Sequence, residues 1–263
     1  MTSPSPAPVV DNHLLGFWAS PRRWLRLVYA VWFDQRWYWQ QVRPHLHNQP
    51  LAWRLLIQTI LGSFCLSLGF IAIPIAALWA PLPLLHIYEG SFRFGLIFIL
   101  CMPLTFGLLG GFLHRPERGI PLAAASISYS LAYSIIVPIA LLVLLTVPID
   151  PDSELPAHTA ALPFGLGLAL PSLEALGVVL GLSEVVTKGE LTWNNRKPIR
   201  VPSGPIWRTV FGSIWFATLI LRGVGTILTD WRYSATSMWF ITLLISSFVS
   251  LVAGQLFAAS LAM

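Results

Sequence analysis

The chain has 263 residues, of which 56% are hydrophobic and only 10% are charged. An ordinary soluble domain carries about 25% charged residues, and so few charges cannot cover the surface of a water-soluble globule of this size. The composition therefore excludes an ordinary soluble domain and indicates an integral membrane protein. The net charge of +5 does not indicate a nucleic-acid partner, because the basic residues separate by side of the membrane once they are placed along the chain.

Residues 1–20 are rich in Pro and polar, without the basic head and apolar core of a signal peptide. We expect a disordered cytoplasmic tail. Residues 21–50 are predicted to form an amphipathic helix and a linker, because Ser20 and Pro21 are typical of a helix start and Pro44 ends the pattern. An apolar face opposite an arginine face is typical of a helix lying in the membrane interface. The predicted interfacial anchors, with arginines that meet anionic lipid, are Arg22, Arg23, Trp24, Arg26 and Trp39.

Phe33 and Trp37 do not fit this simple pattern, since both project from the arginine face. Either they fold over the rim of the helix into the lipid interface, or they contact a partner protein. The sequence leaves both interpretations open.

The rest of the chain, 51–263, is predicted to be a bundle of six transmembrane helices, because each apolar run is near the roughly 20 residues that span a bilayer. The fold class is therefore all-α, a polytopic membrane protein with an N-terminal interfacial helix. A cytoplasmic loop, 183–206, separates the fourth and fifth spans. The expected spans are about 54–80, 92–113, 121–147, 159–182, 207–229 and 237–260.

The basic residues predict the orientation of this bundle. Thirteen of the 16 Lys and Arg residues lie in the N-terminal region and in the two loops on the same side of the predicted spans. By the positive-inside rule both termini are cytoplasmic. We expect a bacterial-type inner membrane, or an internal membrane of equivalent topology.

Glu174 is the sharpest single feature, because a carboxylate in the membrane interior costs about 2.5–3.5 kcal/mol on insertion scales and should face protein or water. Pro171 in the same span frees a backbone carbonyl one turn back. A carboxylate beside a freed carbonyl can bind a cation or relay a proton. The alternative is a protonated Glu174 that is hydrogen-bonded to a neighbouring helix.

Hydroxyl residues line one face of the third span at helical spacing, and a weaker stripe in the sixth span includes Ser250. They could line a polar path, or they could let helices pack closely and hydrogen-bond across the interface. The third-span residues are Ser126, Ser130 and Tyr133. Two GxxxG spacings predict further helix packing, at Gly107 and Gly111 and at Gly177 and Gly181.

Several chemistries are set aside. The chain has no phosphate-binding GxxxxGK[ST] loop, no HExxH metalloprotease motif and no GxSxG serine-hydrolase motif. No metal-ligand spacing appears, and no cofactor is indicated. We therefore expect a protein that is not an enzyme.

Two functions remain open. The first is a transport or channel-type subunit, permease-like, with a polar path near Glu174 and the third span. The second is a non-transporting structural or assembly subunit of a larger membrane complex. Expected partners are the lipid bilayer, other membrane subunits or further copies of the chain, and a cytoplasmic protein at 183–206. The layout resembles, in architecture only, permease subunits of ATP-driven exporters.

Overall fold

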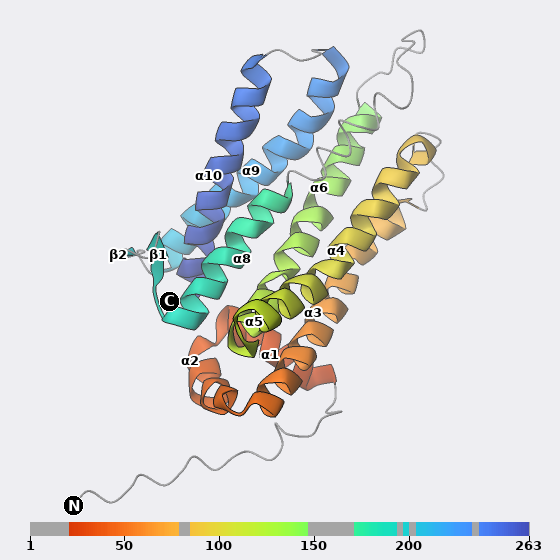
Figure 1. The fold of residues 1–263 in the computed structure, drawn as a ribbon. Helices are drawn as coiled ribbons and strands as arrows, with labels where there is room; N and C mark the ends of the chain where they lie inside the picture. Colours follow the sequence, from red (N-terminus) through yellow and green to blue (C-terminus); the bar gives the residue numbers. More distant parts are fainter. Residues whose placement is uncertain are drawn as a thin grey trace, which may run out of the picture.

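The computed structural model in Figure 1 describes residues 21–78, 85–146, 171–193, 197–199, 204–232 and 237–262. Long helices run side by side along one axis, and the N-terminal segments lie across one end of this bundle. The tail 1–20 lies outside the described residues, as do 159–170 of the predicted fourth span.

Helices dominate the described part, so the prediction of a helical protein is confirmed. Two three-residue strands add a small hairpin within the segment that we expected to be a loop. The main helices are α1 (Pro21–Phe33), α3 (Gln49–Leu78), α4 (Leu85–His114), α5 (Pro116–Ala125), α6 (Ile127–Thr146), α8 (Pro171–Lys188), α9 (Pro205–Arg232) and α10 (Ser237–Ala262).

Two helical stretches of the described chain are long and apolar enough to cross a membrane, Gln49–Ala72 and Pro116–Ile136. Three shorter apolar stretches accompany them, at Ile97–Leu113, Pro205–Leu221 and Ile245–Leu261. Length and composition alone support this assignment. The six-span arrangement therefore stays a prediction.

The apolar pattern predicts one N-terminal helix that continues to Pro44, but the helix in the structure is shorter. It ends at Phe33, and Asp34 leaves the helical conformation with φ −134° and ψ 60°. Its side chain accepts a hydrogen bond from the Trp37 backbone N–H at 3.2 Å and so begins the short helix α2 (Gln35–Trp37). A π-helical turn, Tyr38–Val42, and a 3₁₀ turn, Arg43–His47, complete the segment. An Asp that caps a new helix competes with helix continuation, which explains the break.

The third predicted span consists of two helices, α5 and α6, separated by a turn at Ser126. The Ser126 hydroxyl donates to the Ala123 carbonyl at 2.7 Å, and the N–H of Tyr129 donates to the Ser126 carbonyl, three residues back. Such 3₁₀ tightening and serine back-bonding bend helices locally. Arg115 alone joins α4 to α5, with a positive φ of 129° that few non-glycine residues adopt.

The segment 183–206 also differs from the predicted loop. Helix α8 continues to Lys188, and Gly189 ends it with φ +80°, a left-handed conformation that favours glycine. The strands β1 (Leu191–Trp193) and β2 (Lys197–Ile199) then pair antiparallel, with Thr192 opposite Pro198. At the same end of the bundle, the Arg208 Nε donates to the Ser260 carbonyl at 2.7 Å and ties α9 to α10.

Candidate functional site

The apolar face of α1 packs on the helical bundle. Leu27, Val28 and Val31 are buried in the common core, and the Trp32 Nε1 donates to the Ala124 carbonyl at 2.9 Å. Burial, with a smaller contribution from Glu117, raises the pKa of the Tyr38 phenol above its ordinary value, so this buried ring stays neutral. The N-terminal segment is therefore part of the folded core.

The predicted interfacial anchors fall into two groups. Arg22 and Arg26 are exposed, and Arg23 is half-buried. Trp24 is half-buried, and its backbone lies against Gly62 of α3, where an added Cβ would lie 2.7 Å from the Trp24 carbonyl oxygen. Trp39 stacks under the Arg43 guanidinium, which lies 3.7 Å from the ring centroid. Arg22 and Arg26 are thus exposed, while both tryptophans contact protein.

Phe33 and Trp37, whose environment the sequence left open, have different surroundings. Phe33 is 59% exposed and forms an aromatic cluster with Tyr29 and Trp32. Trp37 is half-buried beneath the Arg26 guanidinium at 4.7 Å. Of the two, Phe33 is the residue that remains available to lipid or to a partner.

The GxxxG glycines lie where helices approach most closely. A Cβ added to Gly177 would lie 2.9 Å from the Leu251 Cα, and one added to Gly181 would lie 2.7 Å from the Gln255 Cα. Both contacts are with backbone atoms, so α8 and α10 touch with no side chain between them. Residue numbers rise together across the contact, which shows that these two helices run in the same direction.

Gly107 and Gly111 hold α4 against α3 and α5. A Cβ on Gly107 would lie 2.7 Å from the Ile60 Cγ1 and 3.1 Å from the Ala123 Cβ. A Cβ on Gly111 would lie 2.7 Å from the Leu56 Cδ2, and one on Gly119 would lie 3.0 Å from the Leu56 Cδ1. Leu56 thus lies level with Gly119, and Ile60 lies level with Ala123.

This register brings two pairs of serines to matching heights. One turn beyond Ile60 and Ala123 come Ser63 and Ser126, and the next turn brings Ser67 and Ser130. All four are fully buried, and α3 and α6 pack against each other. We call these four residues the serine seam. Ser126 bonds to its own helix, whereas the hydroxyls of Ser63, Ser67 and Ser130 have no hydrogen-bond partner among the described residues.

Helix α4 carries a backbone carbonyl without its helical partner at the height of Ser67. Pro103 lies buried inside α4 and has no N–H, so the carbonyl of Ile99 lacks its helical partner. Because α4 runs antiparallel to α3, the register through Gly107 and Ile60 places this turn level with Ser67. Ser67, Ser130 and this turn of α4 thus lie at one level of the bundle, and Ser63 lies one turn nearer to Ile60. Buried polar groups of this kind require water, an ion or another partner.

The opposite face of α6 carries a different polar residue, Ser128. Ser128 donates to the Ala175 carbonyl of α8 at 3.1 Å, and it lies about 200° around α6 from Ser126 and Ser130. The predicted third-span stripe therefore faces α3 rather than the helix that carries Glu174. Tyr133 is buried, and Tyr129 stacks on Phe106 of α4 at 5.6 Å.

Glu174 lies in the first turn of α8, which begins at Pro171. Pro171 therefore starts a helix in the described structure, and the residues before it lie outside the described part. Helix α8 begins part-way along the neighbouring α10 (Figure 1). The Gly177–Leu251 contact places Glu174 at the height of the middle of α10. The side chain of Glu174 is outside what the structure describes. Ser250 lies close by in the same register and is 3.2 Å from the Thr218 hydroxyl of α9.

Sequence reasoning missed Ser63 and Ser67. With Thr59 they recur every four residues in the first span, the same signal that singled out Ser126 and Ser130. No group of three or more His, Cys, Asp or Glu side chains lies close enough to hold a metal ion within the searched part of the chain. The oxygens of the serine seam are all uncharged.

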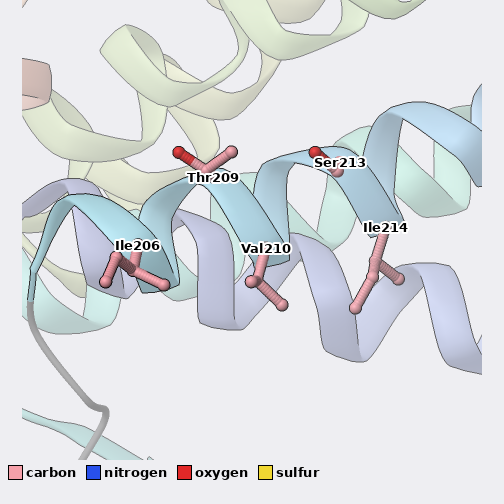
Figure 2. A pocket seen from close by; sticks show the side chains of 5 residues that line it. All are labelled: Ile206, Thr209, Val210, Ser213 and Ile214. Carbon is pink, nitrogen blue, oxygen red and sulfur yellow. The ribbon is translucent and has the colours of Figure 1, made fainter.

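One face of α9 is open in the structure. Figure 2 shows five side chains of successive turns that project from this face and line a shallow pocket of about 480 Å³. The residues are Ile206, Thr209, Val210, Ser213 and Ile214. Small hydroxyl residues alternate with β-branched apolar residues here, a composition common where membrane helices pack.

Comparison with protein-family models, with curated proteins and with solved structures gave no match to this chain.

Proposed function

We propose that the protein is a polytopic membrane protein of the transport or channel class, in which Ser63, Ser67 and Ser130 of the serine seam form the polar site for a small monovalent cation. One observation carries this proposal: Ser63, Ser67 and Ser130 are fully buried, and their hydroxyls have no hydrogen-bond partner among the described residues. Neutral hydroxyl and carbonyl oxygens are ligands of Na⁺ and K⁺ in membrane proteins, where helix irregularities supply the carbonyls. Glu174 precedes Ala175, whose carbonyl accepts the Ser128 bond on the opposite face of α6. It is a candidate for proton or cation entry from the α8 side of α6.

Packing alone is a weaker explanation of the serine seam. Small hydroxyl residues that serve helix packing usually hydrogen-bond across the helix interface. Ser128 does so toward α8, and Ser250 does so toward α9. Ser63, Ser67 and Ser130 are equally buried, but their hydroxyls have no hydrogen-bond partner among the described residues. This difference between serines of one bundle favours a site in which a bound ion supplies the missing partner.

Flux measurement in liposomes tests this function directly. The purified full chain is reconstituted into vesicles loaded with Na⁺ or K⁺. These vesicles are expected to release one of the two ions faster than loaded vesicles without protein do. Ser130→Ala removes an oxygen ligand and should lower the flux at least about tenfold, since a hydrogen bond or ligand to a charge contributes about 1.5–3 kcal/mol. Ser126→Ala is the matched control, because that hydroxyl is already bonded within its helix.

Two results would contradict the transport function. One is a flux of both ions equal to that from loaded vesicles without protein. The other is a Ser130→Ala protein that transports as fast as the Ser126→Ala protein.

A non-transporting subunit of a membrane complex is the second candidate, and the open face of α9 favours it (Figure 2). On this hypothesis the particle isolated in mild detergent has a mass larger than one chain. Ser213→Trp, which fills the face with a bulky ring, should reduce that mass to a single chain. Ile97→Trp, at an exposed position of α4, should leave it unchanged. A wild-type particle with the mass of one chain argues against this candidate.

A further inference from the structure

An apolar pocket of about 360 Å³ lies between α1, α3 and α6. Leu25 and Val28 of α1 form one wall, Leu66 and Phe70 of α3 form the second, and Ile127 and Leu131 of α6 form the third. Three lining side chains carry a polar atom, Tyr29, Trp32 and Ser128. The Ser128 hydroxyl is already bonded to the Ala175 carbonyl, and the Trp32 Nε1 is bonded to the Ala124 carbonyl. The lining therefore suits an apolar guest that needs no hydrogen-bond partner.

The walls of this pocket are fixed in place. Gly62 lets the backbone of Trp24 approach α3 directly, and the Trp32 Nε1 bond to the Ala124 carbonyl holds the other end of α1 on the bundle. The first contact holds α1 on α3, and the second holds it on α5. The pocket thus lies beside a helix whose position is set by its contacts with α3 and α5.

Positive charge lies beside the rim. Arg22, Arg26, Tyr29 and Phe33 follow one another on a single stripe of α1, at spacings of four, three and four residues. All four are exposed, and the two aromatic rings belong to the pocket lining. An apolar pocket with arginines along one edge matches a molecule that has an apolar tail and an anionic head.

We propose that this pocket binds one acyl chain of an anionic phospholipid whose phosphate lies at Arg22 and Arg26. The proposal depends on the membrane location of the protein but not on transport. A protein without flux can therefore still bind the lipid, and the two ideas fail separately. Covering the rim with lipid also removes the exposed Tyr29 and Phe33 rings from water.

Native mass spectrometry of the full chain with added phosphatidylglycerol or phosphatidylcholine tests the site. The wild-type protein is expected to retain one phosphatidylglycerol more tightly than phosphatidylcholine. Leu66→Trp fills the pocket and should raise the Kd for phosphatidylglycerol at least about tenfold, because the acyl chain loses its volume. Leu68→Trp is the matched control, since Leu68 lies on the same helix, is 42% exposed and does not line the pocket.

A second set of variants tests the predicted contact of the lipid headgroup with Arg22 and Arg26, and these variants do not disturb the core. Arg22→Gln with Arg26→Gln should weaken phosphatidylglycerol binding about thirtyfold, from about 1 kcal/mol per arginine near an anionic surface, and leave phosphatidylcholine unchanged. Arg36→Gln, exposed beyond the break at Asp34, should have no effect. The proposal is overturned by equal phosphatidylglycerol binding in Leu66→Trp and Leu68→Trp. Equal binding of the two lipids by the wild type, or a second copy of the chain in place of lipid, overturns it as well.

Discussion

Replacing Gly177 by alanine is expected to lower the free energy of unfolding by about 2–3 kcal/mol, the upper part of the roughly 1–3 kcal/mol that overpacking costs in a tight core. The added methyl group would meet the carbonyl oxygen, the Cα and the carbonyl carbon of Leu251. These are backbone atoms of α10, so no side chain can rotate away to make room. Helices α8 and α10 would have to separate along their whole contact, including the second close approach at Gly181.

The chain supplies its own controls for this effect. Gly69, inside α3, has nothing within 4 Å of an added Cβ, and alanine there should gain about 0.5–1 kcal/mol from helix propensity. Gly212 is intermediate, because its Cβ would meet only the Phe257 ring at 2.9 Å, and a ring can shift. Denaturation in mixed detergent micelles, followed by circular dichroism, measures all three. If Gly177→Ala and Gly69→Ala prove equally stable, the direct backbone contact of α8 with α10 is wrong.

The position of these glycines illustrates what the sequence can predict. A GxxxG spacing indicates that a helix has a flat face, because the two glycines lie on one side of it. It does not indicate which helix meets that face. The sequence contains no signal that pairs Gly177 with Leu251, or Gly107 with Ile60, since these contacts depend on how the whole bundle assembles.

The N-terminal segment shows a signal that was present but outweighed. The apolar period continues across Asp34, so periodicity alone predicts one helix to Pro44. Asp is also a strong N-cap, and here the bond from Trp37 N–H to the Asp34 side chain begins a new helix. Packing decides between the two readings, because the break lets Tyr38 and Val42 reach the core while α1 remains on α3.

The candidate site was predicted in part. Periodicity singled out Ser126, Ser130 and Tyr133 as one face of a helix, and the sequence predicted a polar path near Glu174 and this third span. Spacing along a helix does not say which neighbouring helix such a face meets. The bond from Ser128 to Ala175 shows that the opposite face of α6 meets α8, and the stripe instead meets Ser63 and Ser67. Those two serines carry the same spacing signal, and only the register through Gly107 and Gly119 brings the two stripes to one level.

Removing the unpartnered hydroxyls is expected to make the protein more stable and less active. Ser67→Ala and Ser130→Ala each delete a buried hydroxyl that has no hydrogen-bond partner in the described part of the chain, and an unsatisfied buried polar group costs about 1–3 kcal/mol. Each variant should therefore raise the free energy of unfolding by about 1 kcal/mol in denaturation without added Na⁺ or K⁺. Ser126→Ala deletes a hydroxyl that donates to the Ala123 carbonyl at 2.7 Å, and it should cost about 0.5–1 kcal/mol instead.

The opposite signs separate the two explanations of the serine seam. If the serines serve helix packing, their hydroxyls bond across the interface in the folded protein, and all three alanine variants lose stability together. If the serines form a cation site, Ser67 and Ser130 are costly in the empty protein and become favourable only when an ion completes the site. Added Na⁺ or K⁺ should then stabilise the wild type by mass action and have little effect on Ser130→Ala. A loss of stability in Ser130→Ala equal to that in Ser126→Ala would leave the seam as a packing surface and remove the basis for transport through it.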